Sequence, residues 1–264
     1  MSGVLGELQP AAWSGHCGPS SWRGYCEQAG AGAASHTLPS VETEDLRLAV
    51  YGRFRRGQVP TVAVLAGDLN ATADEVGIGL KALAEQRHLA LGADGEITMA
   101  HPFSAVPLGF SVMGHDALWW GGCAWDAFAL PHILPDQSPV LVATTCPACD
   151  SAHAWQVDNR EPPPGDQVAH FLVPASHMWD DVVHTCAHQR IFCSEGCVTT
   201  WLDRQALKRG YVMDLPTLWR LASGWYAGRL ERGYVRREPS AAAEYLRGVG
   251  LSGSFWGLSD TPSA

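Results

Sequence analysis

The segment WWGGCAWDA, residues 119–127, joins a short β run to a helix through a pair of glycines. Leu118–Trp120 has the large apolar residues of a strand, and the helix is expected to cover Cys123–Leu130 and to stop at the following proline. Cys123 and Asp126 are three residues apart and so share one face of this helix. Because the glycines place Cys123 near the positive end of the helix, we expect its thiolate form to be favoured. Asp126 can then take the thiol proton and return it, which is general acid–base chemistry.

Three of the 11 tryptophans, Trp119, Trp120 and Trp125, crowd around Cys123 in the sequence. Their amphipathic rings predict a dry pocket beside the thiol. The alternative for Cys123 is a small buried hydrophobic residue, which is the usual place of a free cysteine.

The chain from residue 101 to residue 264 alternates short β runs with helices, which predicts an α+β domain with a mixed or antiparallel sheet and flanking helices. The other expected strands are Phe110–Met113, Val140–Thr145, Ala154–Val157, His170–Val173, Val182–Thr185 and Arg190–Phe192. The other expected helices are Glu195–Lys208, Leu215–Arg229 and Ala241–Val249.

Residues 41–100 show the order helix, helix, helix, hairpin, which is typical of a winged helix-turn-helix module. Thr72 to Glu75 form a capping box at the start of the third helix. The module carries six basic and nine acidic residues, and this balance disfavours a DNA-binding surface. We therefore expect a structural module that covers the larger domain.

Composition limits the remaining possibilities. Of the 264 residues, 46% are hydrophobic and 17% are charged, enough for a sizeable core, and the net charge of −9 argues against nucleic-acid or anionic-membrane partners. No apolar run reaches the roughly 18 residues of a membrane span, and the N-terminus does not resemble a secretory signal. The sequence thus predicts a soluble cytoplasmic protein.

Residues 1–40 are rich in Gly, Ala and Ser and are predicted to form a flexible tail. Cys17 and Cys26 lie in this tail. They indicate either a metal-handling arm or an extension with incidental thiols.

Two segments of the larger domain resemble the organomercurial (alkylmercury) lyase family. The first combines HPFSAVP, residues 101–107, with WWGGCAWDA, and matches an N-P-F-S-like motif and a W-x-x-C-A-x-D-A-like catalytic segment. The second runs from WDDVVHTCAH, residues 179–188, into FCSE, residues 192–195, and matches the later cysteine of the family. The resemblance extends over residues 44–205.

The resemblance implies cleavage of carbon–mercury bonds to a hydrocarbon and Hg(II), with Cys123 and Cys186 binding mercury and Asp126 relaying a proton. These residue types suit the reaction, because two soft thiolates on one mercury push electron density toward the carbon. Cys193 and Cys197 lie close to Cys186 in the sequence, and Cys193 is the next candidate for the second thiolate. The family implies no required cofactor. The implied partners are the organomercurial substrate, free cellular thiols and a mercuric reductase that receives Hg(II).

Two cysteine pairs depart from the family pattern. Cys146 and Cys149 form a C-x2-C knuckle, and Cys193 and Cys197 form a second pair at a predicted helix start, with 43 residues between the two pairs. This arrangement is typical of a structural zinc bound by four thiolates, although the second spacing is one residue longer than the common knuckle. The alternative is a set of buried thiols, with Cys146 at the position of a structural cysteine of the family.

Two other functions remain open. One is a thiol enzyme of the same fold that acts on a substrate without mercury, because a fold and a nucleophile do not specify a substrate. The other is a metal-responsive regulator that joins a winged helix to a cysteine-rich sensor. The acidic balance of residues 41–100 disfavours the regulator.

Overall fold

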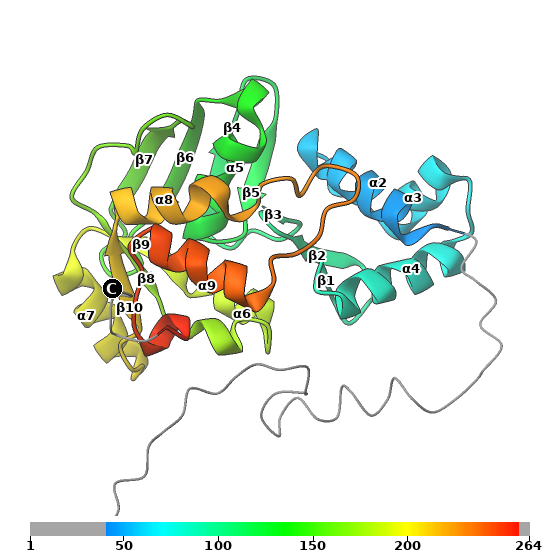
Figure 1. Ribbon diagram of the computed structural model, residues 1–264. Helices are drawn as coiled ribbons and strands as arrows, with labels where there is room; N and C mark the ends of the chain where they lie inside the picture. Colours follow the sequence, from blue (N-terminus) through cyan, green and yellow to red (C-terminus); the bar gives the residue numbers. More distant parts are fainter. Residues whose placement is uncertain (1–40, 259–264) are drawn as a thin grey trace, which may run out of the picture. The chain divides into compact units, whose positions relative to one another are not determined.

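The computed structural model describes residues 41–258, which contain a seven-stranded sheet in the order β1-β2-β3-β5-β4-β6-β7 (Figure 1). Neighbouring strands are antiparallel throughout. The inward residues of β6, Val140, Val142 and Thr144, alternate with more exposed ones, as expected for a sheet with one buried face. The strands are β1 (Ala90–Leu91), β2 (Ile97–Ala100), β3 (Phe103–Ser104), β4 (Phe110–Met113), β5 (Leu118–Gly121), β6 (Val140–Thr145) and β7 (Ala152–Val157).

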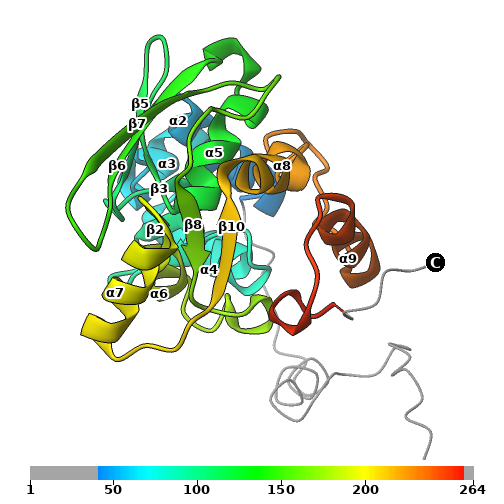
Figure 2. The ribbon, with the colours of Figure 1, turned by 90° about the vertical axis from the view of Figure 1, so that its left-hand side faces the viewer.

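A second sheet has three antiparallel strands in the order β10-β8-β9, and Figure 2 shows β8 and β10 side by side. They are β8 (Val168–Phe171), β9 (Gln189–Phe192) and β10 (Tyr211–Asp214). The predicted α+β class with antiparallel sheets is confirmed. The sequence analysis missed β10, and it placed β8 two residues too far along the chain, at His170–Val173.

Helix α5 (Ala124–Ile133) packs between the large sheet and helix α8 (Leu215–Trp225). Residues 124–131 of α5 are all buried, so the helix is enclosed on every side, and Asp126 is its one charged residue. The prediction that α5 ends before Pro131 is wrong. Pro131 lies in the last turn of the helix, where its ring removes the hydrogen bond to the Ala127 carbonyl, and the buried surroundings of Pro131 offset this loss and keep the turn helical.

The segment before β9 is helix α6 (Val182–Ala187), where the sequence predicted a strand over Val182–Thr185. The carboxylate of Asp181 accepts the His184 N–H at 2.9 Å and caps the first turn. This cap outweighs the strand preference of the β-branched residues. Cys186 consequently lies in the last turn of a helix.

The predicted helices at the C-terminal end of the chain are present, with ends shifted by up to four residues. Besides α8, they are α7 (Glu195–Gln205) and α9 (Pro239–Gly248). Single turns of 3-10 helix, η2 (Pro135–Gln137), η3 (Ala175–His177) and η4 (Ser254–Trp256), lie in the connections.

Three helices precede β1, in the predicted order: α2 (Thr43–Arg55), α3 (Val62–Leu69) and α4 (Ala73–Glu85). The predicted capping box is confirmed, because Thr72 Oγ1 accepts the Glu75 N–H at 3.3 Å and the Glu75 carboxylate accepts the Thr72 N–H at 2.8 Å. The β1–β2 hairpin continues into the large sheet through the pairing of β2 with β3. The winged-helix assignment of residues 41–100 and the boundary at residue 100 stay predictions.

Buried polar contacts join α2 to the rest of the described chain. Arg47 forms a salt bridge with Glu44 at 2.7 Å and donates a hydrogen bond to the Arg229 carbonyl at 2.6 Å. The Trp119 indole on β5 donates to the Phe54 carbonyl at 2.7 Å. Helix α2 therefore contacts both the large sheet and the segment that follows α8.

The helices of residues 41–258 are short. The longest, α2 and α4, have 13 residues each, whereas a transmembrane helix needs about 20 apolar residues. None of the helices in this range is long and apolar enough to cross a bilayer.

Candidate active site

Asp126, in the first turn of α5, is a fully buried carboxylate with a hydrogen bond to each oxygen. His101 Nδ1, in the turn between β2 and β3, lies 2.9 Å from Asp126 Oδ2. The Tyr226 hydroxyl, just after α8, donates to Asp126 Oδ1 at 2.6 Å. Two distant parts of the chain thus fix the orientation of this carboxylate.

The pKa of Asp126 is lowered even though the group is buried. Burial alone raises the pKa of a carboxyl, but attraction to His101 and the hydrogen bonds from His101, Tyr226 and Cys123 outweigh it. Asp126 is therefore an ionised acceptor at neutral pH and can take up a proton.

Cys123 caps helix α5, because its Sγ accepts the Asp126 N–H at 3.4 Å and its backbone is extended. The sequence analysis placed Cys123 inside the helix, but Cys123 is the N-cap, one residue before the helix begins at Ala124. Gly121 is the last residue of β5.

The expectation that the thiolate of Cys123 is favoured is also wrong for the substrate-free protein. Cys123 is only 2% exposed, and burial raises its pKa well above the ordinary value, with further contributions from Cys186 and Asp126.

Cys186 extends from α6 toward the same carboxylate, and its Sγ donates to Asp126 Oδ2 at 3.9 Å. It is 3% exposed. A hydrogen bond with Cys123 lowers the pKa of Cys186, but burial and the Asp126 charge outweigh it, so that the net shift is upward. The structure therefore brings together all three predicted site residues, with both thiols protonated.

Residues from other parts of the chain contact the backbone and the ring of His101. Arg229 Nη1 donates to the His101 carbonyl at 3.1 Å and to the Tyr51 hydroxyl of α2 at 3.3 Å. The rings of His101 and Trp179 pack edge to face, with 5.7 Å between their centroids. The position of His101 therefore depends on residues from the N-terminal helices and from the segment after α8.

The three tryptophans of the predicted pocket point to different parts of the fold. Trp125 is buried among the aromatic rings of Phe171, Trp225, Tyr226 and Trp256. Trp119 is buried toward α2, and Trp120 is 38% exposed and turned away from the core. Of these three residues, Trp125 is linked to the site, because its ring centroid lies 6.3 Å from that of Tyr226, which donates to Asp126.

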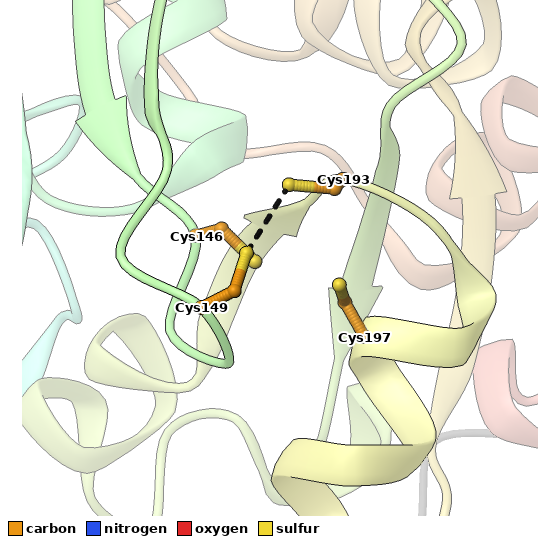
Figure 3. A group of neighbouring side chains, drawn as sticks. All are labelled: Cys146, Cys149, Cys193 and Cys197. Carbon is orange, nitrogen blue, oxygen red and sulfur yellow. Dashed lines mark hydrogen bonds between the residues drawn. The ribbon is translucent and has the colours of Figure 1, made fainter.

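The four remaining cysteines of the described chain form a second cluster (Figure 3). Cys146 and Cys149 lie in the β6–β7 connection, Cys193 follows β9, and Cys197 is in the first turn of α7. Their sulfur atoms all lie within 4.8 Å of one another. Hydrogen bonds with Ser151 and the neighbouring thiols lower the pKa of Cys149 to about 6, whereas burial and Cys149 raise that of Cys193 to about 12.

Sequence reasoning missed the partners of Asp126. His101 belongs to the HPFSAVP motif, but its spacing from Asp126 gave no sign of contact, and no motif marked Tyr226 or Arg229. Residues so far apart in the chain meet only through the pairing of strands and the packing of α8 on α5. Cys17 and Cys26, the suggested metal-handling arm, lie outside the described residues.

Known proteins share both the sequence pattern and the fold. The family model for alkylmercury lyase matches residues 103–227. A solved structure described as the mercury-bound form of MerB2 is similar to this chain with a TM-score of 0.55 and 19% identity, over 74% of this chain and 94% of that one. At this identity the likeness shows the fold, and a comparison with curated proteins finds no match. The resemblance to the alkylmercury lyases expected from the sequence is therefore confirmed over residues 103–227, which carry Cys123, Asp126 and Cys186, whereas the expected part at residues 44–102 lies outside the match.

Proposed function

We propose that this protein is an organomercurial lyase that protonolyses carbon–mercury bonds to give a hydrocarbon and Hg(II). The observation that carries the proposal is the meeting of two buried thiols with one buried, ionised carboxylate. The alkylmercury lyase match over residues 103–227 and the fold shared with a mercury-bound structure support it. No cofactor is required for this chemistry.

The reaction begins with exchange of ligands on mercury. The substrate R–Hg–SR′ exchanges its external thiolate for one of the two cysteines, and the cysteine proton leaves with R′SH. The second cysteine then bonds to mercury and its proton moves to Asp126. The raised thiol pKa values and the lowered carboxyl pKa keep this proton on the cysteine until mercury bonds to the sulfur, which makes the thiol acidic and drives the transfer. Cys186 Sγ already donates to Asp126 Oδ2, and the 3.9 Å between the two atoms must shorten for this transfer.

The second stage breaks the carbon–mercury bond. Two thiolates make the mercury electron-rich, and protonated Asp126 delivers its proton to the carbon, so the bonding pair becomes the new C–H bond. R–H leaves, Hg(II) remains on Cys123 and Cys186, and Asp126 is ionised again. Free cellular thiols then remove Hg(II), and a mercuric reductase is the proposed recipient.

The experiment that tests the proposal measures turnover of methylmercury and phenylmercury with an excess of free thiol. We expect methane and benzene to be released in proportion to Hg(II). A folded protein that binds these compounds without releasing hydrocarbon contradicts the proposal, and favours a thiol enzyme of this fold with another substrate.

We propose that the winged-helix module, residues 41–100, supports the catalytic domain, residues 101–264, and does not bind DNA. Its contacts support this role, since Tyr51 and Arg47 pack against the buried segment around Arg229 that holds His101. The acidic balance of residues 41–100 leaves few groups to neutralise phosphates.

We therefore predict that a gel shift with duplex DNA shows no specific, salt-sensitive complex at physiological ionic strength. Promoter DNA that lies upstream of the protein's own coding sequence is the most demanding probe. A sequence-specific complex tighter than micromolar would favour the metal-responsive regulator instead.

A glycine beside the site gives a further prediction. A Cβ on Gly122 lies 2.4 Å from Asp126 Oδ2 and 2.4 Å from Met99 Cε, so Gly122→Ala displaces the carboxylate that Tyr226 and His101 hold. A shift of about 1 Å in a reacting group costs roughly 10²-fold in rate, and we expect a fall in kcat of that size in methylmercury turnover.

Gly77→Ala is the matched control. Gly77 lies within α4 and has no heavy atom within 4 Å of the added methyl group, so this variant should keep full activity and the same or a higher Tm. Equal activity of the two variants would show that the carboxylate tolerates displacement.

A further inference from the structure

The four cysteines outside the active site occupy positions that a metal ion can bridge. They come from two connections that are far apart in the chain, and all four side chains point into one common gap (Figure 3). We propose that Cys146, Cys149, Cys193 and Cys197 bind one zinc ion as four thiolates. This site is separate from the mercury chemistry proposed above and does not depend on it.

The first pair lies in a tight turn between β6 and β7. The Cys146 N–H donates to the Ser151 carbonyl at 2.9 Å, and the Asp150 N–H donates to the Cys146 carbonyl at 2.9 Å. Asp150 adopts a left-handed conformation with φ of 60°, which closes the turn. The turn places the two sulfur atoms on the same side, as a zinc knuckle requires.

The second pair has a spacing that the helix start explains. Cys193 directly follows β9, Ser194 is the N-cap of α7 and accepts the Cys197 N–H at 3.4 Å, and Cys197 is the third residue of the helix. A cysteine before the cap and a cysteine in the first turn lie near one another with three residues between them.

The burial of the four thiols fits a ligand set better than a packed core. Cys146 is buried, Cys193 and Cys197 are half-buried and Cys149 is exposed. Cysteines that serve as small hydrophobic residues are normally buried, whereas the side chain of Cys149 is exposed to solvent. All four are free thiols, and the Sγ atoms of Cys149 and Cys193 are 3.5 Å apart, well beyond a disulfide bond.

The surroundings show what the ion would stabilise. The buried residues next to the four thiols form a small core of their own, in which Phe192, Val198, Trp201 and Leu202 provide most of the apolar surface. A metal ion would stabilise so small a core substantially. The four ligands come together only in the folded protein, so the free energy of metal binding adds to the free energy of folding. The ion would join the β6–β7 connection of the large sheet to β9 and α7.

A neighbouring histidine provides the polar contact that metal thiolates usually have. His153 Nε2, on β7, lies 3.4 Å from Cys193 Sγ. In the tautomer with hydrogen on Nε2 it donates to this sulfur and supports the thiolate. Four thiolates in a compact group select zinc over harder cations such as magnesium and calcium.

The test measures metal in the full chain, produced with zinc and without mercury. We expect about one zinc per chain by elemental analysis, and little or none in Cys149→Ser and Cys197→Ser. Cobalt(II) exchanged into the protein should show thiolate charge-transfer absorption and the intense visible bands of a tetrahedral site, and both should disappear in these variants. Loss of the ion should lower the Tm by roughly 10 °C or more.

Cys123→Ser and Cys186→Ser are the matched controls, because they make the same chemical change outside the four-thiol cluster. Both should keep one zinc per chain. If Cys149→Ser does not fold, Cys149→His supplies a replacement ligand and should restore folding together with zinc.

Three results would overturn the proposal. One is a wild-type protein that folds in zinc-rich medium without zinc and takes up no cobalt. Another is retention of zinc by folded Cys149→Ser and Cys197→Ser. The third is loss of zinc in Cys123→Ser or Cys186→Ser, which would place the ion in the active site.

Discussion

Cys123→Ser and Cys186→Ser are each expected to lower hydrocarbon release by at least roughly 10³-fold while the protein stays folded. Both thiols lie beside Asp126, and the proposed reaction needs both on the same mercury atom. Serine matches cysteine in size, but its hydroxyl is a hard ligand that stays protonated at neutral pH. The measurement is methane or benzene release by gas chromatography, with circular dichroism and thermal melting to establish folding.

The Cys186 variant is the more informative of the two. If Cys186 only fills space in the core, Cys186→Ser lowers the Tm but leaves turnover close to normal. That outcome would refute its proposed role and make Cys193 the next candidate for the second thiolate. Cys193 lies in the four-thiol cluster with Cys149, so the structure favours Cys186.

Asp126→Asn is expected to separate binding from bond cleavage. Asparagine keeps the shape of the side chain, accepts the Tyr226 hydrogen bond and can donate to a neutral His101, so the fold should persist. Both thiols remain, and the variant should bind R–Hg. Without a group that takes and returns the proton, hydrocarbon release should fall roughly 10²-fold or more.

Mass spectrometry of the intact protein shows whether the Asp126→Asn variant carries R–Hg, and gas chromatography measures the rate of release. A variant that keeps normal turnover would exclude Asp126 as the proton relay. Combining Asp126→Asn with Cys186→Ser should cost little more than the worse single change, because the groups act as one unit.

The segment around Cys123 shows how well the local sequence predicts secondary structure. The strand, the glycine pair and the helix are where the pattern predicts them, since each depends on neighbours in the chain. The end of the helix was misplaced because the proline rule is local, whereas the core around Pro131 stabilises the extra turn. The β-branched residues from Val182 onward predicted a strand by the same kind of local rule. The segment is a helix, because the Asp181 side chain caps its first turn.

The electrostatics of the site were the least predictable part. A helix start favours a thiolate, and the sequence analysis applied this rule to Cys123, but the pKa depends more strongly on burial. The residues that bury and orient the site, Tyr226 and Arg229, lie about one hundred residues further along the chain. Their roles arise from tertiary packing, which one sequence does not reveal.

The upward pKa shifts of Cys123 and Cys186 have a consequence for the protein without bound substrate. Peroxide attacks thiolates and spares neutral thiols, so the resting protein is protected against oxidation to sulfenic acid. A metal that binds at Cys123 and Cys186 must also displace two protons that the raised pKa values hold on the sulfur atoms. In the proposed reaction the high affinity of mercury for sulfur offsets this cost, so that the neutral thiols would favour the softest metals.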